Sequence, residues 1–537
     1  MNDTIKKLTD YEHLRLRTEM YLGSRTKHTQ EILLYNENGT PELRECTWVP
    51  ALCTAFREAL DNACDEIIGH GFGHRLDVTY DEATHTITVQ DDGRGIPITY
   101  DAAHKDYLAS MVVSNTKAGR NFDERGRVSG TNGIGVSAVN MTSKWFEISI
   151  HRDNKHFVQR FEENPLPEGK ELLKRKPKIK DVTSEKTGTC VSFTPSERVF
   201  PDLTLPNDFI KSRVYEVAVA HPLIRVYYNG ERVKVQHNVE RTLFPERETV
   251  ILDIKSDNFN SKFILVPNFT NTGDFTHSIV NSIPAFNGGV HIDTFKRLFY
   301  TGLLSALERE AKRRKITPNR SDISEGLLIY NVTYMNAPDF DSQSKTRLIN
   351  EWVGDAIKKY FDEEDFFGKL IKKHRTWIDS IFERAAERTN KKDLADTKKA
   401  LRSAKKAKVP GLMDASGSDR SKCILFLAEG LSAVAGLATV RNPDIHGGLG
   451  LRGKVLNVNG EIPKRVLDNS TIVDIMNSVG LMIGERATRS TLRYGKIYIA
   501  ADQDQDGANI TALLINFFTH TGRNYLIQTK NRLYTFL

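Results

Sequence analysis

The 537 residues are 39% hydrophobic and carry a net charge of +7, which allows several hydrophobic cores and permits a nucleic-acid partner without demonstrating one. A chain of this length predicts about three domains. No apolar stretch approaches the ~20 residues of a membrane helix, and no apolar secretory segment opens the chain, which excludes a membrane-spanning protein. The five cysteines form no CxxC pair, which excludes a disulfide framework and a cysteine zinc site. We therefore predict a cytoplasmic protein with reduced cysteines.

The first element that suggests chemistry is a helix predicted over residues 51–68. Glu58 and Asn62 are four positions apart and therefore share one face of that helix. Glu58 has the chemistry of a general base, and Asn62 offers a neutral oxygen to a metal ion. Taken alone, such a pair is more often part of a solvated helix surface.

A strand predicted over residues 86–90 runs directly into an acidic, glycine-rich turn at 91–97. Asp91, at the end of the strand, offers a carboxylate that accepts a hydrogen bond from an amino group such as that of adenine. Gly95 allows the turn to approach a ligand closely. In isolation the same segment suits an ordinary hairpin turn.

Glycines also mark residues 129–136, which lead into a short helix at 137–143. A loop that enters a helix presents backbone N–H groups to phosphates, so Gly130, Gly133 and Gly135 are candidate phosphate ligands. Their spacing does not match the dinucleotide fingerprint. Two further strands are predicted over 146–151 and 189–194. Thr189 opens the second, where its hydroxyl is placed to bond a base or a bound water.

In this order, the four segments resemble the GHKL (Bergerat-fold) ATPases, a group that includes gyrase B, type IIA topoisomerases and histidine kinases. The resemblance implies that Glu58 activates water, that Asn62 holds Mg²⁺ on the phosphates and that Asp91 binds the adenine amino group. It also implies the remaining ATP contacts of this domain, two of which resemble the eukaryotic type IIA enzymes: Ser114, Asn115, Gly95, Gly130, Asn132, Gly133, Gly135 and Thr189.

The next region continues as a mixture of strands and helices, with strands predicted over 263–266 and 327–334 and an amphipathic helix over 346–361. Gln343 and Lys345 precede that helix. They resemble the Gln-x-Lys loop of the type IIA transducer domain, whose lysine reaches the γ-phosphate of ATP. A compact ammonium group suits a terminal phosphate. Without its context, Lys345 would be taken for one more surface lysine.

A long charged helix is predicted over 370–410, followed by a linker and then by the strand–helix alternation of a parallel sheet. Two apolar runs, 424–428 and 496–500, each end in acids: Glu429 after the first, and Asp502, Asp504 and Asp506 after the second. In an extended backbone alternate side chains share a face, and packed carboxylates favour a hard cation such as Mg²⁺. We therefore predict one shared magnesium site at these strand ends.

This last region resembles the TOPRIM domain of the same enzymes, with Arg452 and Lys454 in a segment expected near DNA phosphate. The segment departs from the family pattern at Ala500 and Ala501, where relatives often carry Met-Thr, and at Leu431, where relatives carry an acid. The Leu431 replacement is expected either to weaken a second metal ion or to alter the local fold. The chain runs about thirty residues beyond Asp506 without a segment resembling the active-site tyrosine region. Tyr525 and Tyr534 lack that context.

Taken together, the resemblance implies a multidomain α+β protein: a GHKL ATPase sandwich, a ribosomal S5-like transducer domain, and an α/β TOPRIM domain with a parallel sheet. The family is that of the type IIA DNA topoisomerases, and the likeness is to the large ATPase-bearing subunit of the T-even bacteriophage enzymes. The expected limits are 1–205 for the ATPase domain, 206–408 for the transducer domain with its long helix, 409–420 for a linker and 421–537 for the TOPRIM domain.

The function implied is ATP-driven passage of one DNA duplex through a transient break in another, with ATP and Mg²⁺ as cofactors. Expected partners are double-stranded DNA, a tyrosine-bearing subunit, a possible further small subunit and a second copy of the ATPase domain. No membrane is involved, and the expected location is the cytoplasm of a host cell. The alternative is an ATP-gated GHKL clamp that binds DNA or protein without cutting DNA strands, as a repair protein or a chaperone does.

Overall fold

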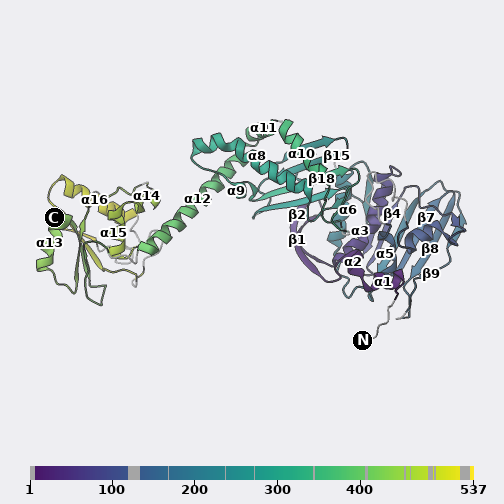
Figure 1. Cartoon of the computed structure of the whole chain (residues 1–537), viewed down its shortest axis with the longest axis horizontal. Coiled ribbons are helices and arrows are strands. Elements are labelled where there is room, and N and C mark those ends of the chain that lie inside the picture. Colours follow the sequence, from purple (N-terminus) through teal and green to yellow (C-terminus); the bar gives the residue numbers. More distant parts are fainter. Residues whose placement is uncertain are drawn as a thin grey trace. The chain divides into compact units, whose positions relative to one another are not determined.

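The computed structural model describes residues 7–118, 133–166, 169–235, 238–270, 272–342, 345–363, 365–404, 409–452, 455–459, 461, 463–481, 488, 491–520 and 533–536. They form two compact units, Met1–Ile381 and Phe382–Leu537 (Figure 1). None of the described helices combines the length and the apolar character needed to cross a membrane.

A large mixed sheet dominates the first half of unit 1, in the order β10-β8-β7-β11-β4-β3-β12-β13, with β9 beside β8. The predicted strands at 86–90, 146–151 and 189–194 are confirmed as β4, β7 and β11. Its strands are β3 (Arg75–Asp81), β4 (Thr86–Asp91), β7 (Ser143–Arg152), β8 (Lys155–Glu162), β9 (Leu173–Lys174), β10 (Lys178–Asp181), β11 (Gly188–Pro195), β12 (Arg225–Tyr228) and β13 (Glu231–Arg232). Two small hairpins accompany it: β1 (His28–Tyr35) with β2 (Pro41–Trp48), and β5 (Tyr100–Asp101) with β6 (Asp106–Tyr107).

Helices α3 and α6 pack against this sheet and share one core with it. Helix α3 begins with Pro50 in its first turn, a position where the missing N–H costs nothing, and nearly all its residues are buried. The helices of this half are α1 (Asp10–Leu16), α2 (Thr18–Leu22), α3 (Pro50–Cys64), α4 (Leu108–Ser114), α5 (Gly135–Met141) and α6 (Asn207–Ala220). The predicted helix 51–68 is confirmed, and its last turn widens into a π-helix, η1 (Asp65–Gly69).

A second sheet, in the order β14-β15-β18-β16-β17, forms the rest of unit 1. Its strands are β14 (Val250–Ser256), β15 (Phe259–Val266), β16 (Asp274–Val280), β17 (Ile283–Pro284) and β18 (Leu327–Met335). Helix α8 lies along this sheet (Figure 1), and the rings of Phe263 and Phe295 stack with centroids 3.9 Å apart. The helices here are α7 (Val239–Leu243), α8 (Val290–Arg314), α9 (Arg320–Ser324), α10 (Trp352–Glu363) and α11 (Phe366–Lys373), and α12 (Arg375–Ala404) begins in unit 1 and continues into unit 2.

Two helix predictions in this region are wrong. The helix expected from residue 346 begins at Trp352, because Leu348 is bridged to both Gly289 and Phe340 and its backbone is committed to those pairings. The helix expected over 370–410 is broken at His374, whose φ of −111° and ψ of 49° leave the helical region. There the His374 side chain contacts Glu248 at 2.7 Å.

The two halves of unit 1 share a buried core. It combines Leu33 and Tyr35 from β1 with Val219 from α6 and with Ile264 and Tyr330 from the second sheet. The hydroxyl groups of Tyr35 and Tyr330 are 2.6 Å apart within it. Burial of this apolar surface explains why residues on both sheets belong to one compact unit.

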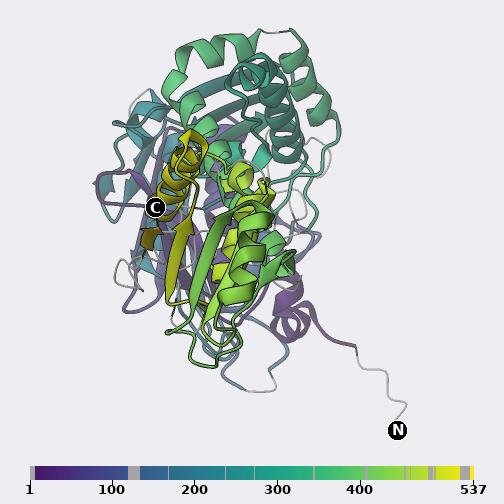
Figure 2. The same cartoon turned by 90° about the vertical axis from the view of Figure 1, so that its left-hand side faces the viewer.

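Unit 2 is built on a five-stranded sheet in the order β19-β21-β20-β22-β23 (Figure 2). Strands β20, β21, β22 and β23 are parallel, as the alternation of strands and helices predicts, and β19 is antiparallel to β21. The strands are β19 (Leu412–Met413), β20 (Ile424–Glu429), β21 (His446–Leu451), β22 (Lys496–Ala500) and β23 (Leu533–Phe536), and the helices are α13 (Gly430–Val440), α14 (Pro463–Leu467), α15 (Ser470–Val479) and α16 (Gln505–His520).

Candidate functional site

Glu58 and Gly135, both predicted nucleotide residues, lie against each other where α3 meets the start of α5. A Cβ atom built on Gly135 would lie 1.9 Å from Oε2 of Glu58, so any larger residue at this position would require the carboxylate to move. Glu58 is buried, with 5% of its surface exposed, whereas Asn62 on the next turn of α3 is exposed. The Glu58 side chain therefore forms the buried part of this region of α3, and the Asn62 side chain forms its exposed rim.

Asp91 ends β4 and is buried below a turn that glycines keep open. Its Oδ1 accepts hydrogen bonds from the backbone N–H groups of Gly93 at 2.8 Å and Thr189 at 3.4 Å. Gly188 packs on the same residue, because a Cβ there would lie 2.1 Å from the Asp91 carbonyl oxygen. Gly95 follows with a φ of 76°, a backbone region that favours glycine. The structure thus brings Asp91, Gly95 and Thr189 together.

Ser114 and Asn115 end helix α4, which lies beside α5. Asn140 of α5 donates from Nδ2 to the carbonyl oxygen of Val113 at 2.8 Å, and the Ser114 hydroxyl donates to the carbonyl oxygen of Ser110 at 2.7 Å. Asn115 is exposed. Gly133, with a φ of 60°, precedes α5, whereas Gly130 and Asn132 lie outside the described residues.

A buried cluster of charges lies on the other side of Glu58. Lys345 reaches α3, where its Nζ is 3.8 Å from Oδ2 of Asp61. Arg57 connects the two acids of the helix, with Nε 3.6 Å from Asp61 Oδ2 and Nη2 3.5 Å from Glu58 Oε1. Burial raises the pKa of Asp61 to about 6, although Lys345 and Arg57 both lower it. Gln343, the partner of Lys345 in the sequence motif, lies outside the described residues.

Arg57 and Asp61 were not among the site residues predicted from the sequence. Their spacing of four positions places them on one face of α3, and that spacing was the available signal. The pattern resembles a solvated helical ion pair. Only the packing of α3 inside unit 1 shows that both side chains are about 3% exposed.

The raised pKa of Asp91 predicts that the folded protein loses stability as the pH rises. Burial raises its pKa from 3.8 to about 7, so the folded state holds the proton more tightly and stability is lost as pH rises from about 4 to 7. Asp91→Asn keeps the acceptor oxygen and removes this cost. We expect the variant's free energy of unfolding, relative to the wild type, to increase by roughly 2–3 kcal/mol between pH 5 and pH 8 in urea titrations. Parallel curves for the two proteins would contradict this, and Asp257→Asn in an exposed turn is the control.

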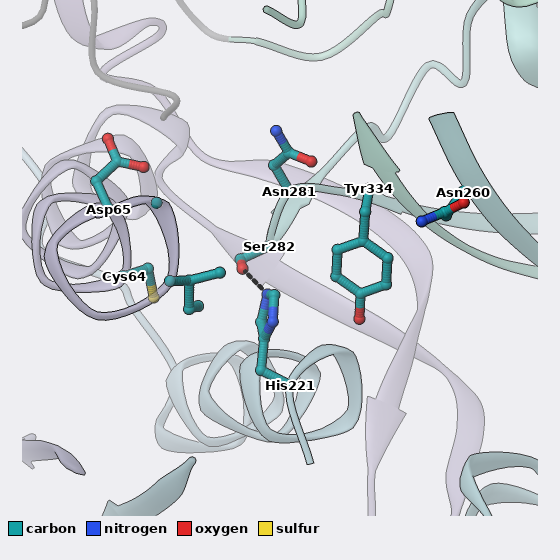
Figure 3. Close-up of a pocket in the computed structure, with 9 residues that line it drawn as sticks. Cys64, Asp65, His221, Asn260, Asn281, Ser282 and Tyr334 are labelled. Atoms are coloured by element: carbon teal, nitrogen blue, oxygen red, sulfur yellow. Dashed lines mark hydrogen bonds between the residues drawn. The ribbon is translucent and has the colours of Figure 1, made fainter. Parts of the chain in front are cut away.

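A cavity of about 210 Å³ lies beyond this cluster, between the end of α3 and the second sheet (Figure 3). Cys64, Asp65 and Tyr334 line it, and the ring of His221 is hydrogen-bonded to Ser282 at 2.7 Å in its wall. None of the predicted nucleotide residues lines this cavity. Asn62 and Cys64 belong to the same helix but are two positions apart, so they face different sides of it.

In unit 2 the two predicted acidic strand ends are adjacent. Strands β20 and β22 pair in parallel, with Ala428 opposite Ala500, so Glu429 and the chain after β22 emerge at one edge. The backbone N–H of Asp502 donates to Oε2 of Glu429 at 3.3 Å. This confirms that the two strand tips meet, as the sequence predicts.

The expectation that the three aspartates alternate along an extended strand is wrong. Strand β22 ends at Ala500 and helix α16 already begins at Gln505, so Asp506 belongs to the first turn of a helix. Asp504 acts as its N-cap, because its Oδ1 accepts the N–H of Gly507 at 2.8 Å. A Cβ on Gly507 would lie 2.1 Å from the Asp502 carbonyl oxygen, which explains the glycine at this tight turn.

The donor set at this edge suits Mg²⁺ chemically, since all four predicted side chains are carboxylates. Among the residues that the structure describes, however, no three His, Cys, Asp or Glu side chains converge closely enough to hold a metal ion. Mg²⁺ commonly keeps several waters and uses only one or two carboxylates, so a closed cage of protein ligands is not required. Arg452 is exposed just after β21, and Lys454 lies outside the described residues.

Three family models match successive parts of the chain. The histidine kinase-, DNA gyrase B- and HSP90-like ATPase model matches residues 49–199, the DNA gyrase B model matches 228–401, and the Toprim domain model matches 424–535. The range matched by the ATPase model contains Glu58, Asn62 and Asp91. The range matched by the Toprim model contains Glu429, Asp502, Asp504 and Asp506.

Curated relatives align along nearly the whole chain. The type 2 topoisomerase B protein of Aquifex aeolicus is 29% identical over 96% of this chain and 64% of its own length. The DNA gyrase B protein of Thermotoga maritima is 29% identical over 96% of this chain and 80% of its own length. The human DNA topoisomerase 2-alpha is 28% identical over 96% of this chain and 34% of its own length, so this chain spans about a third of that protein.

Solved structures confirm the fold of the first part. The ATPase region of Saccharomyces cerevisiae topoisomerase II superimposes with a TM-score of 0.59 at 24% identity, covering 72% of this chain and 99% of that one. The ATPase and transducer domains of topoisomerase II from Balamuthia mandrillaris give a TM-score of 0.60 at 24% identity, covering 72% of this chain and 98% of that one. With GHKL ATPase, transducer and Toprim domains in this order, the chain is similar along nearly its whole length to gyrase B and topoisomerase II proteins and is type IIA topoisomerase B-subunit-like.

Proposed function

We propose that this chain is the ATP-hydrolysing subunit of a type IIA DNA topoisomerase. The observation that supports this most strongly is the combination, in one chain, of a buried carboxylate under a glycine-started helix and of acids at two adjacent parallel strand tips. The names of the relatives, type 2 topoisomerase and gyrase B proteins, support the same function.

In the proposed ATP site, Glu58 is the base that activates water. It is buried next to the start of α5, where N–H groups face an incoming phosphate, and water there is shielded from bulk solvent. Asn62 at the exposed rim holds the Mg²⁺ that accompanies ATP, and Asp91 accepts the adenine amino group. The remaining contacts are assigned to Gly95, Ser114, Asn115, Thr189, Gln343 and the glycine loop with Gly130, Asn132, Gly133 and Gly135.

We further propose that ATP binding joins two copies of the ATPase domain and closes a gate over one DNA duplex. Lys345 links the terminal phosphate to the transducer domain, because it follows β18 of the second sheet in the chain yet its side chain reaches α3. Loss of that phosphate on hydrolysis releases the lysine and resets the gate.

At the Toprim edge, Glu429, Asp502, Asp504 and Asp506 are the proposed holders of Mg²⁺. Bound there, Mg²⁺ stabilises negative charge on phosphate and leaving oxygens during DNA cleavage. Asp502 and Asp504 are exposed, so their carboxylates are accessible to a cation and to a DNA phosphate. Arg452 and Lys454 are proposed to contact the DNA backbone.

The nucleophilic tyrosine is proposed to come from outside these residues, on a partner subunit, with a further small subunit in the complete enzyme. We also propose an origin among the T-even bacteriophage enzymes, which would place the protein in the cytoplasm of a host cell. The proposed domain limits are 1–205, 206–408, 409–420 and 421–537.

The test is a comparison of two activities of the purified chain. It should release phosphate from ATP in the presence of Mg²⁺ and leave supercoiled plasmid intact. Adding the tyrosine-bearing subunit should then produce relaxation that depends on both ATP and Mg²⁺. Nicking or relaxation of plasmid by the chain alone would contradict the division of labour proposed here.

A second candidate function is an ATP-gated DNA clamp without cleavage activity. Leu431 favours it, because this residue is 52% exposed next to Glu429, where the family pattern has an acid. The two candidates differ in one outcome. A clamp retains plasmid when ATP binds but yields no Mg²⁺-dependent cleavage when the tyrosine-bearing subunit is added.

A further inference from the structure

Lys345 has two possible partners, only one of which belongs to the proposed ATPase mechanism. That mechanism requires its ammonium group at the terminal phosphate of ATP. In the structure the same group lies at Asp61, a residue to which the mechanism gives no role. Competition between these two partners for one ammonium group rests on the proposed function.

The contact between Lys345 and Asp61 is buried and its backbone is constrained. Lys345 is 7% exposed and Asp61 is 3% exposed, so neither charge is well solvated. The backbone of Lys345 has a φ of 52°, a left-handed conformation that disfavours a side-chain-bearing residue. Its N–H donates to the carbonyl oxygen of Ser342 at 3.0 Å. A residue held in such a conformation is usually fixed by its surroundings, and such residues are common at switches.

Arg57 makes it feasible for Asp61 to give up the lysine. Removing one partner of a buried ion pair is strongly destabilising when the remaining charge has no other partner. Here Oδ2 of Asp61 is also 3.6 Å from Nε of Arg57, itself buried on the same helix. Asp61 therefore keeps a cation beside it when Lys345 moves.

We propose that Asp61 is a positioning residue that holds Lys345 next to the nucleotide site and competes with the terminal phosphate of ATP for it. Nucleotide that carries a γ-phosphate must take the lysine from Asp61, whereas ADP leaves the pair intact. Asp61 thereby sets how strongly the protein distinguishes ATP from ADP, and it returns the lysine to its resting position after hydrolysis.

The test compares the affinities of the full chain for ADP and for the non-hydrolysable analogue AMPPNP. Asp61→Asn keeps the size of the side chain and removes its charge. We expect AMPPNP to bind about tenfold more tightly to this variant, with ADP affinity unchanged. In a Lys345→Met background the same Asp61 substitution should have no effect on the AMPPNP-to-ADP ratio.

Three results would overturn the proposal. Weaker AMPPNP binding to Asp61→Asn would mean that Asp61 assists the lysine at the phosphate. A gain in AMPPNP affinity that persists in Lys345→Met would mean that Asp61 merely repels the phosphate. An equal change for both nucleotides would indicate a structural role and would also count against it.

A second measurement does not depend on the folding of Asp61→Asn. In nucleotide-free protein, Lys345→Met removes one partner of a buried pair and should lower the urea midpoint of unfolding. Lys358→Met, on the exposed side of α10, should leave it unchanged. An unchanged midpoint for Lys345→Met would refute the pairing. Failure of the wild-type chain to bind AMPPNP at all would instead refute the proposed ATP site.

Discussion

Replacing Glu58 by glutamine is expected to lower the turnover number for ATP by about 10²- to 10⁴-fold while nucleotide binding persists. The carboxylate is 5% exposed and its Oε2 faces the first residue of α5, the helix start that we propose receives the terminal phosphate. Glutamine has the same shape and cannot accept the proton. Phosphate release gives the turnover number, and calorimetric titration with AMPPNP gives the affinity.

The matched control for Glu58 is Glu308→Gln, an exposed glutamate on α8. It makes the same chemical change away from the site and should alter neither value. Turnover that is unchanged in Glu58→Gln would refute the assignment of the base. A loss of AMPPNP binding in that variant would show that the carboxylate is needed for binding rather than for the chemical step.

In the complete enzyme, Asp504→Asn and Asp502→Asn are expected to abolish DNA cleavage and leave ATP hydrolysis largely intact. The reason for the separation is that these residues and Glu58 belong to different compact units. Asp504→Asn is the more informative change, because asparagine caps a helix about as well as aspartate and α16 should keep its first turn. The variant therefore removes a charge without removing a structural contact.

Cleavage is measured as linear and nicked plasmid trapped with denaturant, over a range of Mg²⁺ concentrations. Asp468→Asn, an exposed residue before α15, is the control within the same unit. Normal cleavage by Asp504→Asn would remove this residue from the metal site. Recovery of cleavage at high Mg²⁺ concentration would instead show a weakened site, as expected if a metal ligand has been lost.

Local patterns predicted the elements that carry the chemistry. Helix 51–68, strand 86–90 and the parallel strands that end near Glu429 and Asp502 all occur as expected. Each was signalled by hydrophobic periodicity or by an apolar run that ends in acids, which are properties of neighbouring residues. The predicted helix start at 346 and the predicted continuous helix over 370–410 failed for the opposite reason, because Leu348 and His374 are committed to contacts with distant segments.

The sequence by itself determined the order of the three domains and the types of side chain offered to nucleotide and metal, because motifs and their spacing are written along the chain. Only the tertiary structure decided that Arg57 and Asp61 are buried with Lys345. Burial and partner choice depend on which distant surfaces pack together. In a low-dielectric interior, that packing turns an ordinary i,i+4 pair into a strongly coupled group of charges.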